Sequence, residues 1–119
     1  MSKVLIEDAV AILPIQDMNA SLAFYEDVLG FERGFVADDL SFATIKHGEA
    51  ALHLLQTDDE ASLEASKNHI SVYLWVKGVD RLYQSLADKL SSLAEGRVRA
   101  PFDQPYGMRE FHVKDEDGC

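Results

Sequence analysis

In the first half of the chain, the spacing of apolar residues changes from a strand pattern to a helix pattern and back to strands. Residues 10–15 form an apolar run typical of a β-strand, and Pro14 places it at a sheet edge because proline donates no ladder hydrogen bond. Apolar residues then recur at helical spacing, at Leu22, Tyr25 and Leu29. Asp17 or Asn19 is the expected N-cap, and Gly30 the expected end of that helix.

Three further strands are predicted before the middle of the chain. They cover residues 31–35, 40–46 and 50–56, with turns between them. Residues 57–68 are polar, acidic and rich in small side chains, so we expect a linker there, which can include a helical turn.

The second half repeats this order of elements. Residues 70–76 predict a strong strand, residues 79–93 a helix with one apolar face, and residues 97–99 and 108–114 two more strands. Such self-similarity indicates two structural repeats. The fold class predicted is α+β, with tandem βαβββ modules forming a cupped mixed sheet.

The predicted organisation is a single domain over residues 1–119. Module one is expected at about residues 5–57, the linker at 58–68 and module two at 69–119. Asp117-Gly118 is a turn signal that calls for a returning strand, which would be the last strand of module two. That strand is missing from residues 69–119, so we expect the natural chain to continue past Cys119.

Composition narrows the classes of partner. The formal net charge of −10 argues against nucleic acid, whose phosphates need lysine and arginine, and favours a cationic small molecule. No apolar run approaches the ~20 residues that span a bilayer, and the N-terminus lacks a signal-peptide pattern. The single cysteine, Cys119, permits no internal disulfide. We therefore expect a cytoplasmic protein with neither a membrane nor a nucleic-acid partner.

Four motifs carry a resemblance to a known family. Residues 22–33 (Leu-Ala-Phe-Tyr-Glu-Asp-Val-Leu-Gly-Phe-Glu-Arg) resemble the first-helix signature of the vicinal oxygen chelate superfamily, which includes glyoxalase I, extradiol dioxygenases and bleomycin resistance proteins. Residues 74–83 and 104–111 are more similar to the bleomycin resistance branch, as are residues 35–39. The resemblance covers nearly the whole chain.

The resemblance also implies where a metal would bind. The superfamily's ligand positions fall at Val10, His53 and Ser71, and the fourth lies beyond Cys119. Only His53 is a competent ligand among these, and protein metal sites generally need three or more. We therefore expect no metal, no cofactor and no catalytic residues. The alternative is a metal-dependent lyase or dioxygenase that uses His53, His69 and a glutamate of the missing strand.

Without a metal, the cup remains as a binding groove, which the branch forms between two chains of a homodimer. Flat aromatic side chains suit a planar heteroaromatic ligand, and acidic ones suit its cationic end. The groove residues predicted are Phe35, Asp38, Asp39, Leu40, Phe42, His53, Ser71, Tyr73, Trp75, Tyr106, Met108, Glu110 and His112. Phe24, Phe31 and Phe111 are expected in the core.

The function expected from this resemblance is metal-free sequestration of a bleomycin-type antibiotic, which confers resistance without catalysis. Glu110 and His112 share a strand face and could form an acid–base pair, although a polar pair lining a pocket is the interpretation we favour. A second alternative is a superfamily member that binds an unrelated small metabolite, because fold does not fix function.

Overall fold

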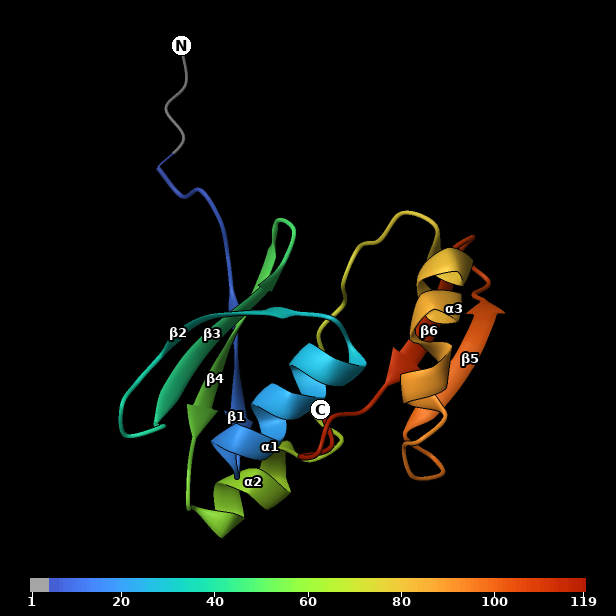
Figure 1. Ribbon diagram of the computed structural model, residues 1–119. Helices are drawn as coiled ribbons and strands as arrows, with labels where there is room; N and C mark the ends of the chain where they lie inside the picture. The colour runs from blue at the N-terminus through green and yellow to red at the C-terminus, as the bar shows by residue number, and fades with distance from the viewer. Residues whose placement is uncertain (1–4) are drawn as a thin grey trace.

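A four-stranded mixed sheet, sheet A, forms module one (Figure 1). The computed structural model describes residues 5–119. The strands are β1 (Ala11–Ile15), β2 (Glu32–Val36), β3 (Phe42–His47) and β4 (Ala50–Gln56), in the order β1-β4-β3-β2. β1 runs parallel to β4, and the other pairs are antiparallel. Pro14 therefore lies in an edge strand, as predicted.

The first helix changes its winding halfway. α1 (Met18–Ala23) begins after Asp17, whose carboxylate accepts a hydrogen bond from the Ala20 backbone N–H at 3.1 Å. It continues as a π-helical turn, η1 (Phe24–Val28). The wider turn lets the consecutive residues Phe24 and Tyr25 both face the core, where they are 4% and 5% exposed.

The core lies between sheet A and this helix. Its members are apolar side chains that alternate along the strands or face the sheet from the helix. They are Leu13, Ile15, Met18, Leu22, Phe24, Tyr25, Phe31, Ala43, Ile45, Leu52 and Leu54. Phe24 and Phe31 thus occupy the core as predicted. The opposite face of sheet A leaves apolar side chains exposed, with Ile12 at 57% and Leu55 at 47%.

Module two is smaller and stands beside module one (Figure 1). α2 (Glu60–Ser66) lies in the predicted linker, and α3 (Val79–Leu90) packs against the two-stranded antiparallel sheet of β5 (Val98–Asp103) and β6 (Arg109–Val113). Tyr83 of α3 meets Phe111 of β6 edge-to-face, with 5.2 Å between ring centroids. Within residues 5–119, no helix has both the length and the apolarity needed to cross a membrane.

The strand predicted at residues 70–76 is wrong, because this segment has no ladder partner. Among the described residues, no backbone hydrogen bond involves positions 71–77. The segment has the β-branched and aromatic composition of a strand, but a strand forms only where a neighbouring backbone completes its hydrogen bonds. Its side chains are instead largely exposed, with Trp75 at 77%.

A buried carboxylate joins the two modules at the end of the chain. Asp115, 5% exposed, accepts a hydrogen bond from the Tyr25 hydroxyl at 2.7 Å. Its other oxygen accepts the backbone N–H groups of Asp117 and Cys119, both at 2.9 Å. The turn that results brings Gly118 against the linker, where a Cβ would lie 2.8 Å from Lys67 Cγ. Burial, followed by the charge of Asp115, raises the pKa of the Tyr25 phenol, which therefore stays a donor.

Tyr25→Phe should therefore destabilise the protein. The substitution keeps the ring in the core but leaves a buried carboxylate with one donor fewer, which typically costs about 1.5–3 kcal/mol. Urea unfolding followed by circular dichroism measures the change. Tyr83→Phe is the control, because the Tyr83 hydroxyl has no hydrogen-bond partner among residues 5–119. Equal losses for the two variants would contradict the role of Asp115.

Candidate functional site

The open face of sheet A carries apolar and aromatic side chains in two rows. Ile12 lies opposite His53, and Phe42 opposite Leu55. Phe42 and His53 contact each other edge-to-face at 5.2 Å between ring centroids. Ile12 is 57% exposed and Leu55 47% exposed. Four side chains that would suit a core are therefore at least partly open to solvent on this face.

Phe35 extends this face from β2, where a glycine positions it. The Phe35 backbone N–H donates to Thr44 Oγ1 at 2.9 Å, at an irregularity in the pairing of β2 with β3. This close approach needs Gly34, because a Cβ there would lie 2.5 Å from the same hydroxyl oxygen. The Phe35 ring is 62% exposed.

The turn after β2 supplies the acidic residues. Asp39 accepts hydrogen bonds from the backbone and hydroxyl of Ser41, and chiefly the hydroxyl lowers the pKa of the Asp39 carboxyl. Leu40 adopts a φ of 62° in this turn, an uncommon conformation for a residue with a side chain. Asp38 and Asp39 are both exposed beside this turn. The turn thus places negative charge at one end of the open face.

A second aromatic surface lies on module two. Tyr73 and Trp75 lie on the segment before α3, with 5.0 Å between ring centroids, and are 50% and 77% exposed. Tyr106, in the loop before β6, is 63% exposed. We call Tyr73, Trp75 and Tyr106 the stacking surface. All three are among the groove residues predicted from the sequence.

Glu110 of β6 connects this surface by hydrogen bonds. Its Oε1 accepts from the Tyr106 hydroxyl at 2.8 Å and from the Tyr73 hydroxyl at 3.3 Å. Its Oε2 lies 2.5 Å from His112 Nε2. Hydrogen bonds from His112, Gln104 and Tyr106 lower the pKa of Glu110 to about 2. The carboxylate is therefore ionised at neutral pH and acts as an acceptor for these donors.

Phe102 and Arg99 of β5 form a stack with His112 that was not predicted from the sequence. His112 contacts Phe102 edge-to-face at 5.1 Å, and the Arg99 guanidinium lies 3.5 Å from the Phe102 ring centroid. Arg99 and His112 are partners in the ladder between β5 and β6. His112 is thus held between a carboxylate and an aromatic ring.

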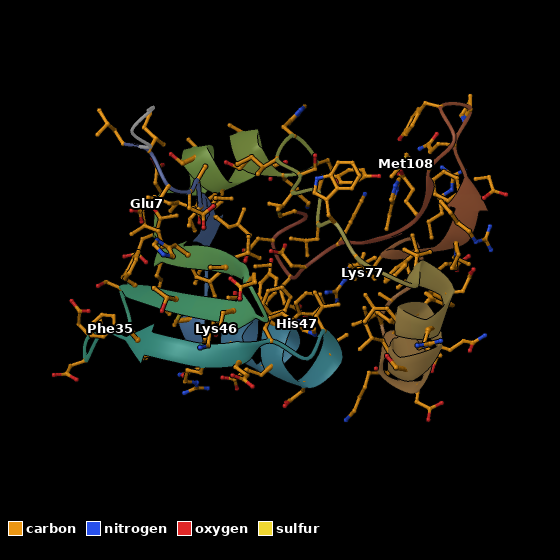
Figure 2. The ribbon with its side chains drawn as sticks, turned by 90° about the horizontal axis from the view of Figure 1, so that it is seen from above. Glu7, Phe35, Lys46, His47, Lys77 and Met108 are labelled. Atoms are coloured by element: carbon orange, nitrogen blue, oxygen red, sulfur yellow. The ribbon has the colours of Figure 1, made fainter. Side chains whose placement is uncertain are left out.

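The predicted site residues separate into two groups within one chain. Phe35, Asp38, Asp39, Leu40, Phe42 and His53 lie on module one, and Ser71, Tyr73, Trp75, Tyr106, Met108, Glu110 and His112 lie on module two. Figure 2 shows Phe35 and Met108 at opposite ends of the molecule. A single chain therefore presents two separate aromatic surfaces.

Two residues of the open face, Ile12 and Leu55, were missed by sequence reasoning. Leu55 had a usable signal, because Leu52 and Leu54 fill the core-facing positions of β4 and leave Leu55 on the other face. Ile12 alternates in the same way with the buried Leu13. Phe102 had no such signal, because the predicted strand stopped at residue 99.

Comparison with known families identifies one family whose model covers most of the chain. Residues 8–119 match the model of the glyoxalase/bleomycin resistance protein/dioxygenase superfamily. No curated protein sequence matches the chain significantly.

Several solved structures share the fold. The bleomycin-binding protein from bleomycin-producing Streptomyces verticillus, in complex with copper(II)-bleomycin, is 28% identical with a TM-score of 0.80, over 98% of this chain and 93% of that one. A bleomycin resistance determinant of transposon Tn5 is 23% identical with a TM-score of 0.77, over 95% and 92%. A glyoxalase-related enzyme from Clostridium phytofermentans is 18% identical with a TM-score of 0.74, over 98% and 92%.

The positions where the superfamily's enzymes bind a metal do not fit one here. Val10 has an alkyl side chain, and Ser71 is exposed with no hydrogen-bond partner among the described residues. His53 packs against Phe42. Across residues 5–119, no group of three or more His, Cys, Asp and Glu side chains is placed to hold a metal ion.

Gly34→Ala should displace Phe35 and destabilise β2. The added Cβ would lie 2.5 Å from Thr44 Oγ1 and 3.2 Å from the Thr44 carbonyl oxygen. Overpacking of this kind typically costs about 1–3 kcal/mol, measurable by urea unfolding. Thr44→Ala in the same chain removes the closer clash, so the double variant should lose less stability than the two single variants summed. Strict additivity would contradict the clash.

Proposed function

Because this chain belongs to the glyoxalase/bleomycin resistance protein/dioxygenase superfamily, we propose that it binds and sequesters a bleomycin-type antibiotic. The ligand class is a small molecule with a planar heteroaromatic part and a cationic end. Binding is stoichiometric and involves no reaction. The observation that carries the proposal is the exposed stacking surface, in which Trp75 is 77% exposed.

The chemistry of the two surfaces suits such a ligand. Exposed aromatic side chains gain about 0.5–1.5 kcal/mol each from stacking, beyond the burial of area. Asp38 and Asp39 are exposed near Phe35, and the chain carries a formal net charge of −10. A bithiazole fits the first feature and a positively charged tail the second. The bleomycin-binding protein of Streptomyces verticillus, at 28% identity, supports this ligand class.

A homodimer completes the groove in this proposal. Phe35 of module one and Met108 of module two lie at opposite ends of one chain (Figure 2), so in this proposal one copy offers a planar ligand only one face to stack on. A second copy that places its stacking surface over the open face of sheet A encloses the ligand from both sides. The same arrangement covers the exposed side chains of Ile12 and Leu55.

We also propose that binding needs no metal ligand from the protein and that the protein is cytoplasmic. Binding is metal-free on the protein side, since Val10 and Ser71 are poor ligands. The expected location is the cytoplasm, which agrees with a single cysteine and no possible internal disulfide.

Titration with bleomycin tests the proposal directly. Isothermal calorimetry should show saturable binding, and emission from Trp75, the sole tryptophan, should change in parallel. At a ligand concentration 100 times Kd, the free energy of unfolding should rise by about 2.7 kcal/mol. Absence of heat, of an emission change and of a melting shift would exclude bleomycin and favour an unrelated metabolite.

Mixed dimers test whether the groove is shared between chains. Phe35→Ala and Trp75→Ala should each weaken binding by about tenfold or more, with little loss of stability because both side chains are exposed. In a dimer that contains one copy of each variant, one groove keeps both aromatic residues and the other loses both. Differently tagged variants, co-expressed and purified through both tags, should recover tight binding at half the stoichiometry of the wild type.

The matched control is a dual-tagged dimer with Phe35→Ala in both copies, which should stay weak. If the mixed dimer binds no better than this control, or if no dimer forms in sedimentation, the groove does not lie between two chains.

A further inference from the structure

Glu110 is the meeting point of three separate parts of module two. The Tyr73 hydroxyl reaches it from the segment before α3, the Tyr106 hydroxyl from the loop before β6, and His112 from β6 itself. The Glu110 side chain is only 12% exposed, whereas the rings of Tyr73 and Tyr106 are largely open to solvent. The carboxylate thus lies beneath the aromatic rings and holds their hydroxyl ends.

The hydrogen bond to Tyr73 matters because its segment has so few others. Among the described residues, the Tyr73 hydroxyl makes the sole hydrogen bond of positions 71–77. A segment without ladder bonds samples many conformations unless side chains restrain it. Trp75 packs against Tyr73 at 5.0 Å, so a restraint on the Tyr73 ring also restrains the indole.

Glu110 itself has little freedom to serve as the ion partner of a ligand. Both of its oxygens already accept hydrogen bonds from protein groups. His112, which contacts Glu110, also contacts the Phe102 ring. The Arg99 guanidinium lies over the same ring. A carboxylate held in this way orients the groups that donate to it, and its oxygens are already engaged by protein donors.

We propose that Glu110 is the positioning residue of the stacking surface: it fixes the rings of Tyr73 and Tyr106, and through Tyr73 the indole of Trp75, in the orientation that receives the planar heteroaromatic part of the ligand. This inference rests on the proposed function and deepens it. The cationic end of the ligand then belongs at Asp38 and Asp39, whose carboxylates are exposed.

Two substitutions separate positioning from ion pairing. Glu110→Gln keeps an oxygen that accepts from both phenols but loses the charge, whereas Glu110→Leu loses both. A positioning role predicts a bleomycin Kd within about threefold of wild type for Glu110→Gln and at least about tenfold weaker for Glu110→Leu. A role as counter-ion predicts equal weakening in both variants, and a loss that diminishes with added salt.

Phenol titration supplies a readout that needs no ligand. Hydrogen bonding to Glu110 raises the pKa of Tyr106, and burial followed by Glu110 raises that of Tyr73. Ultraviolet titration of Glu110→Leu should therefore show two tyrosines ionising at lower pH than in wild type. Glu95→Leu is the control, because Glu95 is exposed on module two and has no side-chain hydrogen bond among the described residues.

The outcomes distinguish this inference from the proposed function. Unchanged tyrosine titration in Glu110→Leu, or a wild-type Kd in that variant, overturns the positioning role while bleomycin binding stands. Equal weakening in the Gln and Leu variants also overturns it. Failure of the wild type to bind overturns the proposed function, and the titration then still decides whether Glu110 holds the two rings. Should Glu110→Leu fold poorly by circular dichroism, Glu110→Gln against the Glu95→Leu control carries the test.

Discussion

The buried Asp115 carboxylate constrains the relation between the two modules. Charged groups are buried only where donors compensate them, and Asp115 receives the Tyr25 hydroxyl and two backbone N–H groups. Tyr25 comes from the π-helical turn of module one, and Asp115 follows β6 of module two by two residues. The Asp115 hydrogen bonds therefore fix where the chain after β6 meets module one. Because Glu110 lies on β6, the position of the stacking surface depends on the same contact.

The two modules hold their aromatic residues by different means. In module one, four strands make a continuous ladder, and Phe42 and His53 take their places from the strand register. In module two the ladder has two strands, and Tyr73 and Trp75 lie on a segment outside it. Side-chain hydrogen bonds replace backbone ones there. A surface held by a few side-chain contacts adjusts to a ligand at lower cost than a surface fixed by a ladder.

Sequence patterns predicted most of the helices and strands because these elements depend on residues close together in the chain. The period change from strand to helix, Gly30 after the first helix and the alternation in residues 50–56 all act within a few residues, and each element is present. The strand prediction for residues 70–76 was wrong because strand formation depends on a partner backbone far away in sequence. The π-helical turn was not predicted for a similar reason. The packing of Phe24 and Tyr25 against sheet A overrides regular helix spacing. The candidate site residues were predicted from their residue types, but their division between two surfaces follows from tertiary placement alone.

The separation of these surfaces bears on how a planar ligand could bind tightly. A ring stacked on Tyr73 and Trp75 of an isolated chain keeps its other face in water, so about half of its apolar area gains nothing from binding. Small-molecule sites generally bury most of the ligand, which needs a second wall. The open face of sheet A offers such a wall in Phe42, Leu55 and Ile12, of which Leu55 and Ile12 are largely exposed in one chain. In the proposed dimer, the stacking surface and the open face would both lose their exposed apolar area to the same ligand. The net negative charge would then favour ligands whose exposed end is cationic.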